Sequence, residues 1–292
     1  MQEDLSIPLR PEPLRPGDLV ALVAPAGPVA AGRAEAAARV LEGWGLRFRF
    51  GGHALGRDGL FSAPDADRLA DLDDALRDPE VRGVVCLRGG YGTQRIVDRV
   101  DYAAVREDPK LIMGFSDITA LHAALWCEAR LPTIHGPTGA SLSAGPAGDA
   151  RRALMTDDPV TLRGEPSAGS ATGILLGGNL AMLAANAGTS HQLDLRGAIL
   201  LLEETNEAAY RVDRMLVQLR RSGSLAGVAG VAVGRFLPEL PRRIIEEHFD
   251  VPVLFGLEVG HGRQQVAVGL GVPARLDAGA GTLTVQSPCR KK

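Results

Sequence analysis

Three polar residues whose types act together in acyl transfer, Ser116, Glu203 and His261, each stand at the end of an apolar stretch of the sequence. Acyl transfer needs a hydroxyl nucleophile, an imidazole that takes its proton, and a carboxylate that holds the imidazolium formed during attack. Parallel α/β sheets place their ligands at the carboxyl ends of the strands, so residues at such ends can face one pocket. The spacing of the three residues then requires the two halves of the chain to face each other across a cleft.

Ser116 follows the apolar run KLIMGF and directly precedes a stretch of helical character. One interpretation is a helix N-cap, because Ser accepts hydrogen bonds from the free N–H groups of a first helical turn. The other is a nucleophile presented at the edge of a sheet. The residues GFSDI (114–118) supply only half of the G-x-S-x-G elbow of α/β-hydrolases, so this signal is weak. Taken alone, the position favours the N-cap.

A glycine-rich turn, RGGYG (88–92), also ends an apolar run. It lacks the G-x-G-x-x-G spacing of dinucleotide-binding loops, and the chain contains no G-x-x-x-x-G-K-[S/T] phosphate loop. The turn is as consistent with a tight connection as with a functional role. In the functional interpretation the N–H of Gly90, unhindered by a side chain, points at a developing oxyanion.

The acidic pair Glu203–Glu204 follows a run of four aliphatic residues. A carboxylate at the end of a buried strand needs a partner, because burying a lone charge is costly. The commoner outcome is that it caps the next helix or pairs with Arg211 or Arg214. The alternative is that it orients a histidine.

His261 differs from the other five histidines because it ends an apolar run between Gly260 and Gly262, where little side-chain bulk hides it. A histidine in such a turn is structural as often as it is functional. No two histidines have the H-x-x-x-H spacing of a metal-binding helix, and none of the three cysteines lies in a C-x-x-C pair. We therefore expect no metal site and no disulfide framework.

Alternating apolar and amphipathic stretches predict the elements that position these residues. In the first half they predict strands over 18–25, 47–50 and 110–117, a strand that runs into the glycine-rich turn within 81–92, and helices over 30–43, 64–77 and 118–129. Such alternation is typical of a parallel sheet covered by helices. Residues 137–173 turn to Gly, Ala, Ser, Pro and Asp, which predicts a linker around a short helix near 148–155.

The second half is predicted to be richer in β-structure. A Gly-Gly turn followed by an apolar helix is predicted within 172–188, a helix over 207–223, and strands over 198–205, 227–236, 252–261 and within 266–287. The predicted domains are 1–137 with the nucleophile, a linker over 138–172, and 173–292 with the glutamate and the histidine. The predicted fold class is α/β: an N-terminal parallel-sheet sandwich of the Rossmann or flavodoxin type and a smaller, β-rich α/β domain.

Composition narrows the functional classes. An apolar content of 45% in 292 residues supports substantial cores, and a formal net charge of −3 gives no electrostatic footprint for nucleic acid or an anionic membrane. The first residues carry acids and prolines where a signal peptide needs a basic start and an apolar stretch. The longest aliphatic stretch, 198–202, is far too short to cross a bilayer. We expect a cytoplasmic protein with no membrane or nucleic-acid partner.

The sequence resembles the LD-carboxypeptidase family of serine peptidases (murein tetrapeptide carboxypeptidases), which includes the microcin C immunity hydrolases. The resemblance rests on an ordered set of segments: LRPGDLVALVAPAGPV (14–29), CLRGGYGTQRIVDRVDY (86–102), KLIMGFSDITALH (110–122), HGP (135–137), GGNLAML (177–183), LLEETNEAAYRVDRML (201–216), VGRF (233–236), GH (260–261) and VAVGLGVPARLD (266–277). Each segment alone is weak, but their order and spacing are specific.

Carried over by position, the resemblance implies Ser116 as nucleophile, His261 as general base and then acid, and Glu203 as the residue that orients His261. The oxyanion hole would be the backbone N–H groups of Gly90 and Asp117. Candidate substrate-binding residues lie within the matched segments: Arg88, Tyr91, Asn179 and Arg235. The resemblance further implies a homodimer, no cofactor, and release of terminal D-alanine from murein peptides during cell-wall recycling.

Departures from the family pattern keep alternatives open. Glu204 and Glu207 lie close to Glu203, and HGPTG stands where the family often has a methionine after HGP. The segment 138–172 has no aromatic residue that could grip a nucleotide, which favours a murein peptidase over a hydrolase of peptidyl nucleotides. A catalytically silent murein-peptide-binding protein is the alternative of another class, and the three retained triad residues argue against it.

Overall fold

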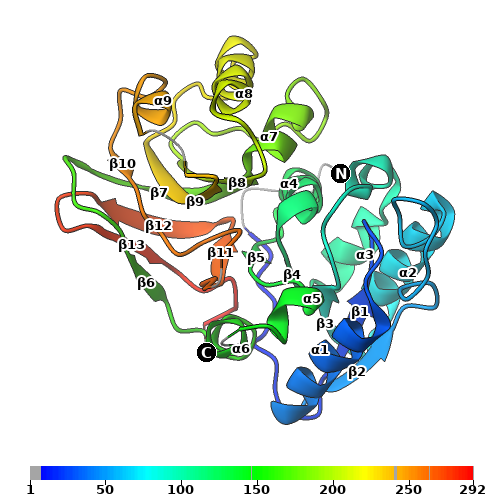
Figure 1. The fold of residues 1–292 in the computed structure, drawn as a ribbon. Helices are drawn as coiled ribbons and strands as arrows, with labels where there is room; N and C mark the ends of the chain where they lie inside the picture. Colours follow the sequence, from blue (N-terminus) through cyan, green and yellow to red (C-terminus); the bar gives the residue numbers. More distant parts are fainter. Residues whose placement is uncertain (1–7, 146, 240–241, 263, 292) are drawn as a thin grey trace, which may run out of the picture.

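The computed structural model describes residues 8–145, 147–239, 242–262 and 264–291 and arranges them around two β-sheets (Figure 1). The first sheet has the strand order β11-β5-β4-β3-β1-β2. Its strands are β1 (Leu19–Val23), β2 (Arg47–Phe50), β3 (Val81–Cys86), β4 (Leu111–Gly114), β5 (Thr133–His135) and β11 (Val268–Leu270). All of its pairings are parallel except that of β11 with β5. The predicted parallel α/β sheet is therefore confirmed, with one short antiparallel strand at its edge.

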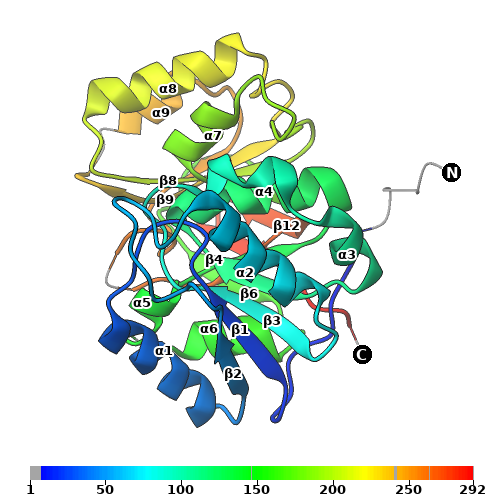
Figure 2. The ribbon, with the colours of Figure 1, turned by 90° about the vertical axis from the view of Figure 1, so that its right-hand side faces the viewer.

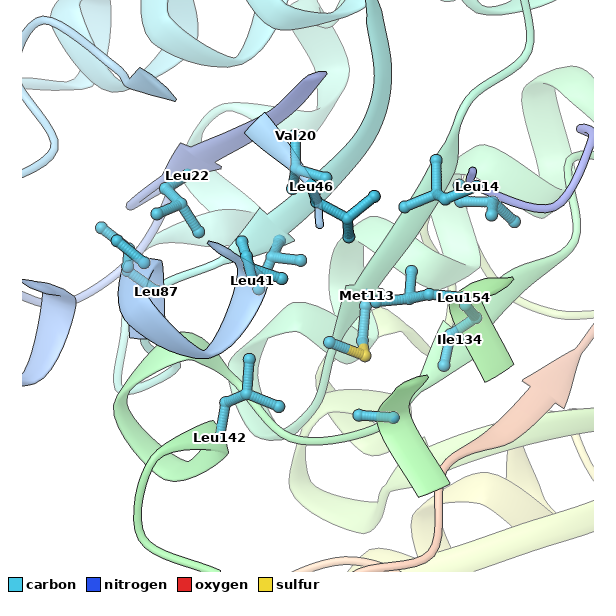
Figure 3. Close-up of a cluster of buried hydrophobic side chains, with 14 of the residues drawn as sticks. Leu14, Val20, Leu22, Leu41, Leu46, Leu87, Met113, Ile134, Leu142 and Leu154 are labelled. Atoms are coloured by element: carbon cyan, nitrogen blue, oxygen red, sulfur yellow. The ribbon is translucent and has the colours of Figure 1, made fainter. Parts of the chain in front are cut away.

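Helices cover both faces of the first sheet, which explains its continuous apolar strands. Successive side chains of β1 point to opposite faces: Val20 and Leu22 join one core, and Ala21 and Val23 join the other. The first core is closed by α1 (Ala31–Gly43), α5 (Gly139–Leu142) and α6 (Gly148–Met155), as Figure 3 shows for Leu41, Leu142 and Leu154. The second core is closed by α2 (Asp65–Arg77), α3 (Tyr102–Glu107) and α4 (Thr119–Ala129).

The second sheet is mixed and has the order β10-β9-β8-β7-β12-β13-β6. Its strands are β6 (Val160–Arg163), β7 (Ser170–Asn179), β8 (Ile199–Thr205), β9 (Gly230–Leu237), β10 (Val253–Leu254), β12 (Val272–Asp277) and β13 (Thr282–Val285). Strands β7 to β10 run parallel, and β12, β13 and β6 are joined antiparallel. One face carries α7 (Leu180–Asn186), α8 (Ala209–Arg221) and α9 (Arg242–Glu246), which Figure 2 shows together.

Helix α4 contacts the cores of both sheets. Leu121 and Leu125 pack into the second core of the first sheet, while Ala123 and Trp126 pack against the helix-covered core of the second. A helix that is apolar all round is typical of such a buried position. Figure 1 shows α4 between the two sheets, and because α4 begins at Thr119, this packing ties the segment that carries Ser116 to both of them.

The chain passes between the two sheets more often than the predicted division into consecutive domains implies. Strand β6 comes from the predicted linker and pairs in the second sheet, whereas helix α6 packs against the first. Strand β11 comes from the C-terminal half and pairs with β5 in the first sheet. The domain limits at 137 and 173 stay a prediction. None of the helices in the part of the chain described here is long and apolar enough to cross a membrane.

Two predicted features differ from the structure. Gly177 and Gly178 do not form a turn; they lie near the end of β7 with φ of 125° and 137°. A Cβ at Gly178 would lie 2.7 Å from Thr119 Oγ1, so glycine lets the strand approach α4. The strand predicted over 252–261 is limited to Val253–Leu254, and the rest is a loop that leads to His261.

Candidate active site

Ser116 begins a single 3₁₀ turn, η3 (Ser116–Ile118), that joins β4 to α4. Its φ is 65°, in the left-handed region that is unfavourable for a residue with a side chain. The N-cap position of α4 belongs to Ile118, and neither η3 nor α4 has a side-chain cap. The N-cap interpretation of Ser116 is therefore wrong. A serine that is partly exposed and has a strained backbone between a strand and a helix is typical of a nucleophile in a hydrolase.

The glycine turn after β3 packs directly against Ser116. A Cβ at Gly89 would lie 2.9 Å from Ser116 Cβ and 3.2 Å from its Oγ, so only glycine permits this approach. Gly90 is exposed and has a φ of 105°. Asp117 Oδ2 accepts a hydrogen bond of 2.9 Å from the N–H of Thr93, which ties the turn to η3. The turn thus lies beside the serine, as an oxyanion-binding loop must.

Glu203 and His261 are in direct contact. Glu203 Oε2 accepts a hydrogen bond from His261 Nδ1 at 2.7 Å and a longer one from its backbone N–H at 3.2 Å. The glutamate is fully buried near the end of β8, and the imidazole is partly exposed. The rings of His261 and Phe115 are 4.7 Å apart between centres, so the imidazole lies next to the residue before Ser116. The structure therefore places Glu203 and His261 in contact, with the imidazole beside the residue that precedes Ser116.

The protonation state of Glu203 is set by two opposing effects. Burial alone would raise its pKa, but the nearby imidazoles of His135 and His261 outweigh burial and lower the pKa to about 2. Glu203 is therefore an anion at neutral pH. An anion that accepts a hydrogen bond from Nδ1 leaves Nε2 of the imidazole free to act as a base.

Glu204 has a different set of partners. Its carboxylate accepts hydrogen bonds from Asn179 Nδ2 at 2.9 Å, from the N–H of Ala181 at 2.7 Å and from the N–H of Thr205 at 2.8 Å. Neighbouring side chains in a strand point to opposite faces, so Glu204 faces α7 while Glu203 faces His261. The geometry separates two carboxylates that the sequence left as alternatives, and Glu204 caps the start of α7.

The four candidate substrate-binding residues lie in different settings. Arg88 is exposed and donates to Pro28 O at 2.6 Å, and Tyr91 is exposed with its ring 5.5 Å from that of Phe61. Asn179 is buried as the N-cap of α7 and donates to Glu204. Arg235 forms an ion pair with Glu258 and approaches Gly262, next to His261. Their proposed contacts with substrate stay predictions.

His135, which the sequence offered only as part of the HGP segment, also lies at this site. It ends β5, is fully buried, and its Nε2 lies 3.9 Å from Glu203 Oε1. A signal was available, because His135 ends a strand next to the one that precedes Ser116. As for metals, the part of the chain that the structure describes contains no group of three or more His, Cys, Asp or Glu side chains placed to hold an ion.

Two family models match the chain. The model described as the LD-carboxypeptidase N-terminal domain matches residues 20–136, and the one described as the LD-carboxypeptidase C-terminal domain matches residues 172–276. The chain belongs to the LD-carboxypeptidase family. As a member of this family it is a peptidase, a hydrolase of peptide bonds.

Curated LD-carboxypeptidase relatives match over almost their whole length. A putative carboxypeptidase of Streptomyces coelicolor is 43% identical over 96% of this chain and 97% of its own. The murein tetrapeptide carboxypeptidase of Pseudomonas aeruginosa is 34% identical over 88% of this chain and 92% of its own.

Solved structures share the fold. The muramoyltetrapeptide carboxypeptidase from Oxalobacter formigenes superposes with a TM-score of 0.84 at 29% identity, covering 93% of this chain and 100% of its own. An MccF-like protein from Bacillus anthracis superposes with a TM-score of 0.87 at 24% identity, covering 96% of this chain and 99% of its own. The arrangement of two sheets is therefore the fold of the LD-carboxypeptidase family.

Proposed function

We propose that this chain is a serine-type LD-carboxypeptidase that releases the terminal D-alanine of murein tetrapeptides by hydrolysing the L,D amide bond. The observation that carries the proposal is the 2.7 Å contact between Glu203 Oε2 and His261 Nδ1, beside a serine held at a φ of 65°. The substrate class is supported by the relatives from P. aeruginosa and O. formigenes, which are named for cleavage of tetrapeptides.

The first half of the reaction is attack by Ser116. A serine hydroxyl is almost wholly protonated at neutral pH, so His261 Nε2 must take its proton as Oγ bonds to the carbonyl carbon. The imidazolium formed is stabilised by the anionic Glu203. His261 then gives the proton to the departing amine of D-alanine as the C–N bond breaks, which leaves an acyl-serine.

The second half returns the enzyme to its starting state. A water molecule gives its proton to His261 and attacks the acyl-serine, and the imidazolium reprotonates Oγ as the peptide acid leaves. In both halves the carbonyl oxygen becomes an oxyanion. The N–H groups of Gly90 and Asp117 would bind it, and one such donor contributes on the order of 3 kcal/mol.

The terminal carboxylate of D-alanine needs a cationic partner. We infer that Arg88 and Arg235 are the candidates, since guanidinium groups bind carboxylates in a bidentate manner. Arg235 approaches the loop of His261, and Arg88 begins the glycine turn. Tyr91, exposed on the same turn, would contact the peptide, and Asn179 would act through the start of α7.

The test is incubation with L-Ala-γ-D-Glu-meso-diaminopimelate-D-Ala and detection of free D-alanine by chiral chromatography, with S116A as control. We expect release by the wild type and none by the variant. Equal release by S116A would overturn the serine mechanism. Cleavage of a peptidyl nucleotide without release of D-alanine would replace the murein substrate by that of the microcin-type hydrolases.

We also propose that the chain works as a homodimer in the cytoplasm, in cell-wall recycling. The support is the family resemblance, together with a composition that offers no footprint for a membrane or nucleic acid. Light scattering of the purified chain at micromolar concentration tests the dimer, and a monomer mass would contradict it. Fractionation of cells that express the chain tests its location.

A further inference from the structure

The two carboxylate oxygens of Glu203 differ in their hydrogen bonds. Oε2 accepts two hydrogen bonds from His261, whereas Oε1 is fully buried and has no hydrogen-bond partner among the residues described. A buried carboxylate oxygen without a donor is costly, because it has lost its water and gained nothing in return. His135 Nε2 lies 3.9 Å from this oxygen.

His135 is unsatisfied in the same way. Both of its ring nitrogens are buried, and neither has a hydrogen-bond partner within the described parts of the chain. Two buried polar groups that both lack partners therefore face each other, one a donor and the other an acceptor. The separation exceeds a hydrogen bond, but a shift of about 1 Å closes it, and hydrogen bonds in unliganded active sites often tighten when substrate binds.

The residues packed around His135 show which other groups could donate a hydrogen bond to Glu203 Oε1. His135 pairs with Gly114 of β4 and Val268 of β11, and its ring is 6.0 Å from that of Phe115 and 6.5 Å from that of His122. Among the residues that the structure describes, the titratable side chains that these contacts place next to it are Glu203 and His122.

His122 cannot take the same role. Its Nε2 donates to Gly114 O at 3.0 Å, and burial lowers its pKa to about 3, so it is neutral and its donor is already used. His122 therefore contributes neither a positive charge nor a free N–H donor to Glu203.

We propose that His135 is a positioning residue, which donates its Nε2–H to Glu203 Oε1 and thereby holds Oε2 against His261 Nδ1. The inference rests on the proposed triad and extends it by one residue behind the glutamate. With both oxygens held, the carboxylate cannot rotate about its terminal torsion, and it stays aimed at the imidazole through each proton transfer.

The test compares His135→Gln with His135→Met. The two side chains have similar length and volume, but only glutamine carries an N–H donor at the position of Nε2. We expect His135→Met to lower kcat about 10- to 100-fold, the range that a hydrogen bond to a charged group supplies, with little change in KM. His135→Gln should recover most of the loss. A role in packing alone predicts equal losses in the two variants, or the larger loss in the glutamine variant, and either result would overturn the proposal.

A second measurement does not need the murein substrate. The rate at which a fluorophosphonate labels Ser116 reports the triad directly, and the downfield N–H resonance of His261 reports its bond to Glu203. We expect slow labelling and a lost or shifted resonance in His135→Met, and near wild-type values in His135→Gln. Wild-type values in His135→Met would overturn the role of His135 and leave the triad standing. A wild type that is not labelled would instead remove the proposed serine mechanism, and the inference with it.

Discussion

Gly260 lies against Glu203 so closely that a side chain could not fit between them. A Cβ at Gly260 would be 2.6 Å from Glu203 Cβ and 2.7 Å from its Cγ, and the φ of Gly260 is 91°. The glycine therefore serves two purposes: it allows the left-handed backbone that turns the loop toward the sheet, and it leaves room for the carboxylate that binds His261.

Gly260→Ala should separate the histidine from the glutamate. The methyl group must displace either the loop or Glu203, and a displacement of about 1 Å at a catalytic group costs on the order of 100-fold in rate. We expect that loss in kcat. Gly223→Ala is the matched control, because Gly223 also has a positive φ, of 80°, but nothing lies within 4 Å of its Cβ position. Equal kcat in the two variants would show that the close approach to Glu203 is not required.

The left-handed backbone at Ser116 predicts that glycine is more stable than alanine at this position. Ser116→Ala and Ser116→Gly both remove the hydroxyl, so both should abolish turnover. Only glycine is at ease at a φ of 65°, and the free energy of unfolding of Ser116→Gly should exceed that of Ser116→Ala by about 1 kcal/mol. Chemical denaturation of the two variants measures the difference. Equal stabilities would mean that the chain relaxes out of the left-handed region without the hydroxyl.

Much of the first sheet could be predicted because its strands are buried on both faces. β1 and β4 are continuous apolar runs and β3 ends in one, and the residues that follow these strands include Pro, Gly or Ser. β5 and β11 have three residues each, too few for any pattern, and their pairing depends on a contact between the two halves of the chain. The glycines near the end of β7 resembled a turn because the reasons for them are tertiary: β8 approaches Gly177 closely, and α4 approaches Gly178.

The triad residues could be proposed from the sequence because each stands where an element ends. The choice of Glu203 over Glu204 rested there on the family resemblance alone, since the physical difference is which face of β8 each side chain takes. The sequence marks His135 as the end of a strand near that of Ser116, but its approach to Glu203 depends on how the two sheets meet, and nothing near it in the sequence indicates that carboxylate.

Glu203→Gln should mainly lower kcat, whereas Glu204→Gln should mainly lower the free energy of unfolding. Glutamine at 203 cannot stabilise the imidazolium, so kcat should fall on the order of 10³- to 10⁴-fold with little change in KM. Glutamine at 204 opposes an amide N–H₂ to the backbone N–H groups that Glu204 now binds, so it should lower the free energy of unfolding by about 1–2 kcal/mol and leave most of kcat. Kinetics and denaturation of both variants test this. A large loss of kcat at 204 with a normal kcat at 203 would exchange the two roles.

The buried His122 predicts a loss of stability in mild acid. Burial lowers its pKa to about 3, whereas an unfolded histidine has a pKa of about 6.5. Between these values the unfolded chain binds a proton that the folded chain excludes, so stability falls as pH falls below about 6.5, by about 1.4 kcal/mol per pH unit. His122→Gln keeps a donor for Gly114 O and does not titrate. Its stability relative to the wild type should therefore improve by about 2 kcal/mol between pH 6.5 and pH 5.

The comparison isolates His122 because the other titratable groups are the same in both proteins, including His135, whose ring is 6.5 Å away. Urea denaturation at a series of pH values gives the two curves. Parallel curves would mean that the protonated imidazole is accommodated in the folded chain, through a shift of α4 or entry of water between α4 and β4. A variant that gains stability relative to the wild type as the pH falls below about 6.5 would instead locate the acid sensitivity of the fold directly behind the serine turn, where β4, α4 and β5 meet.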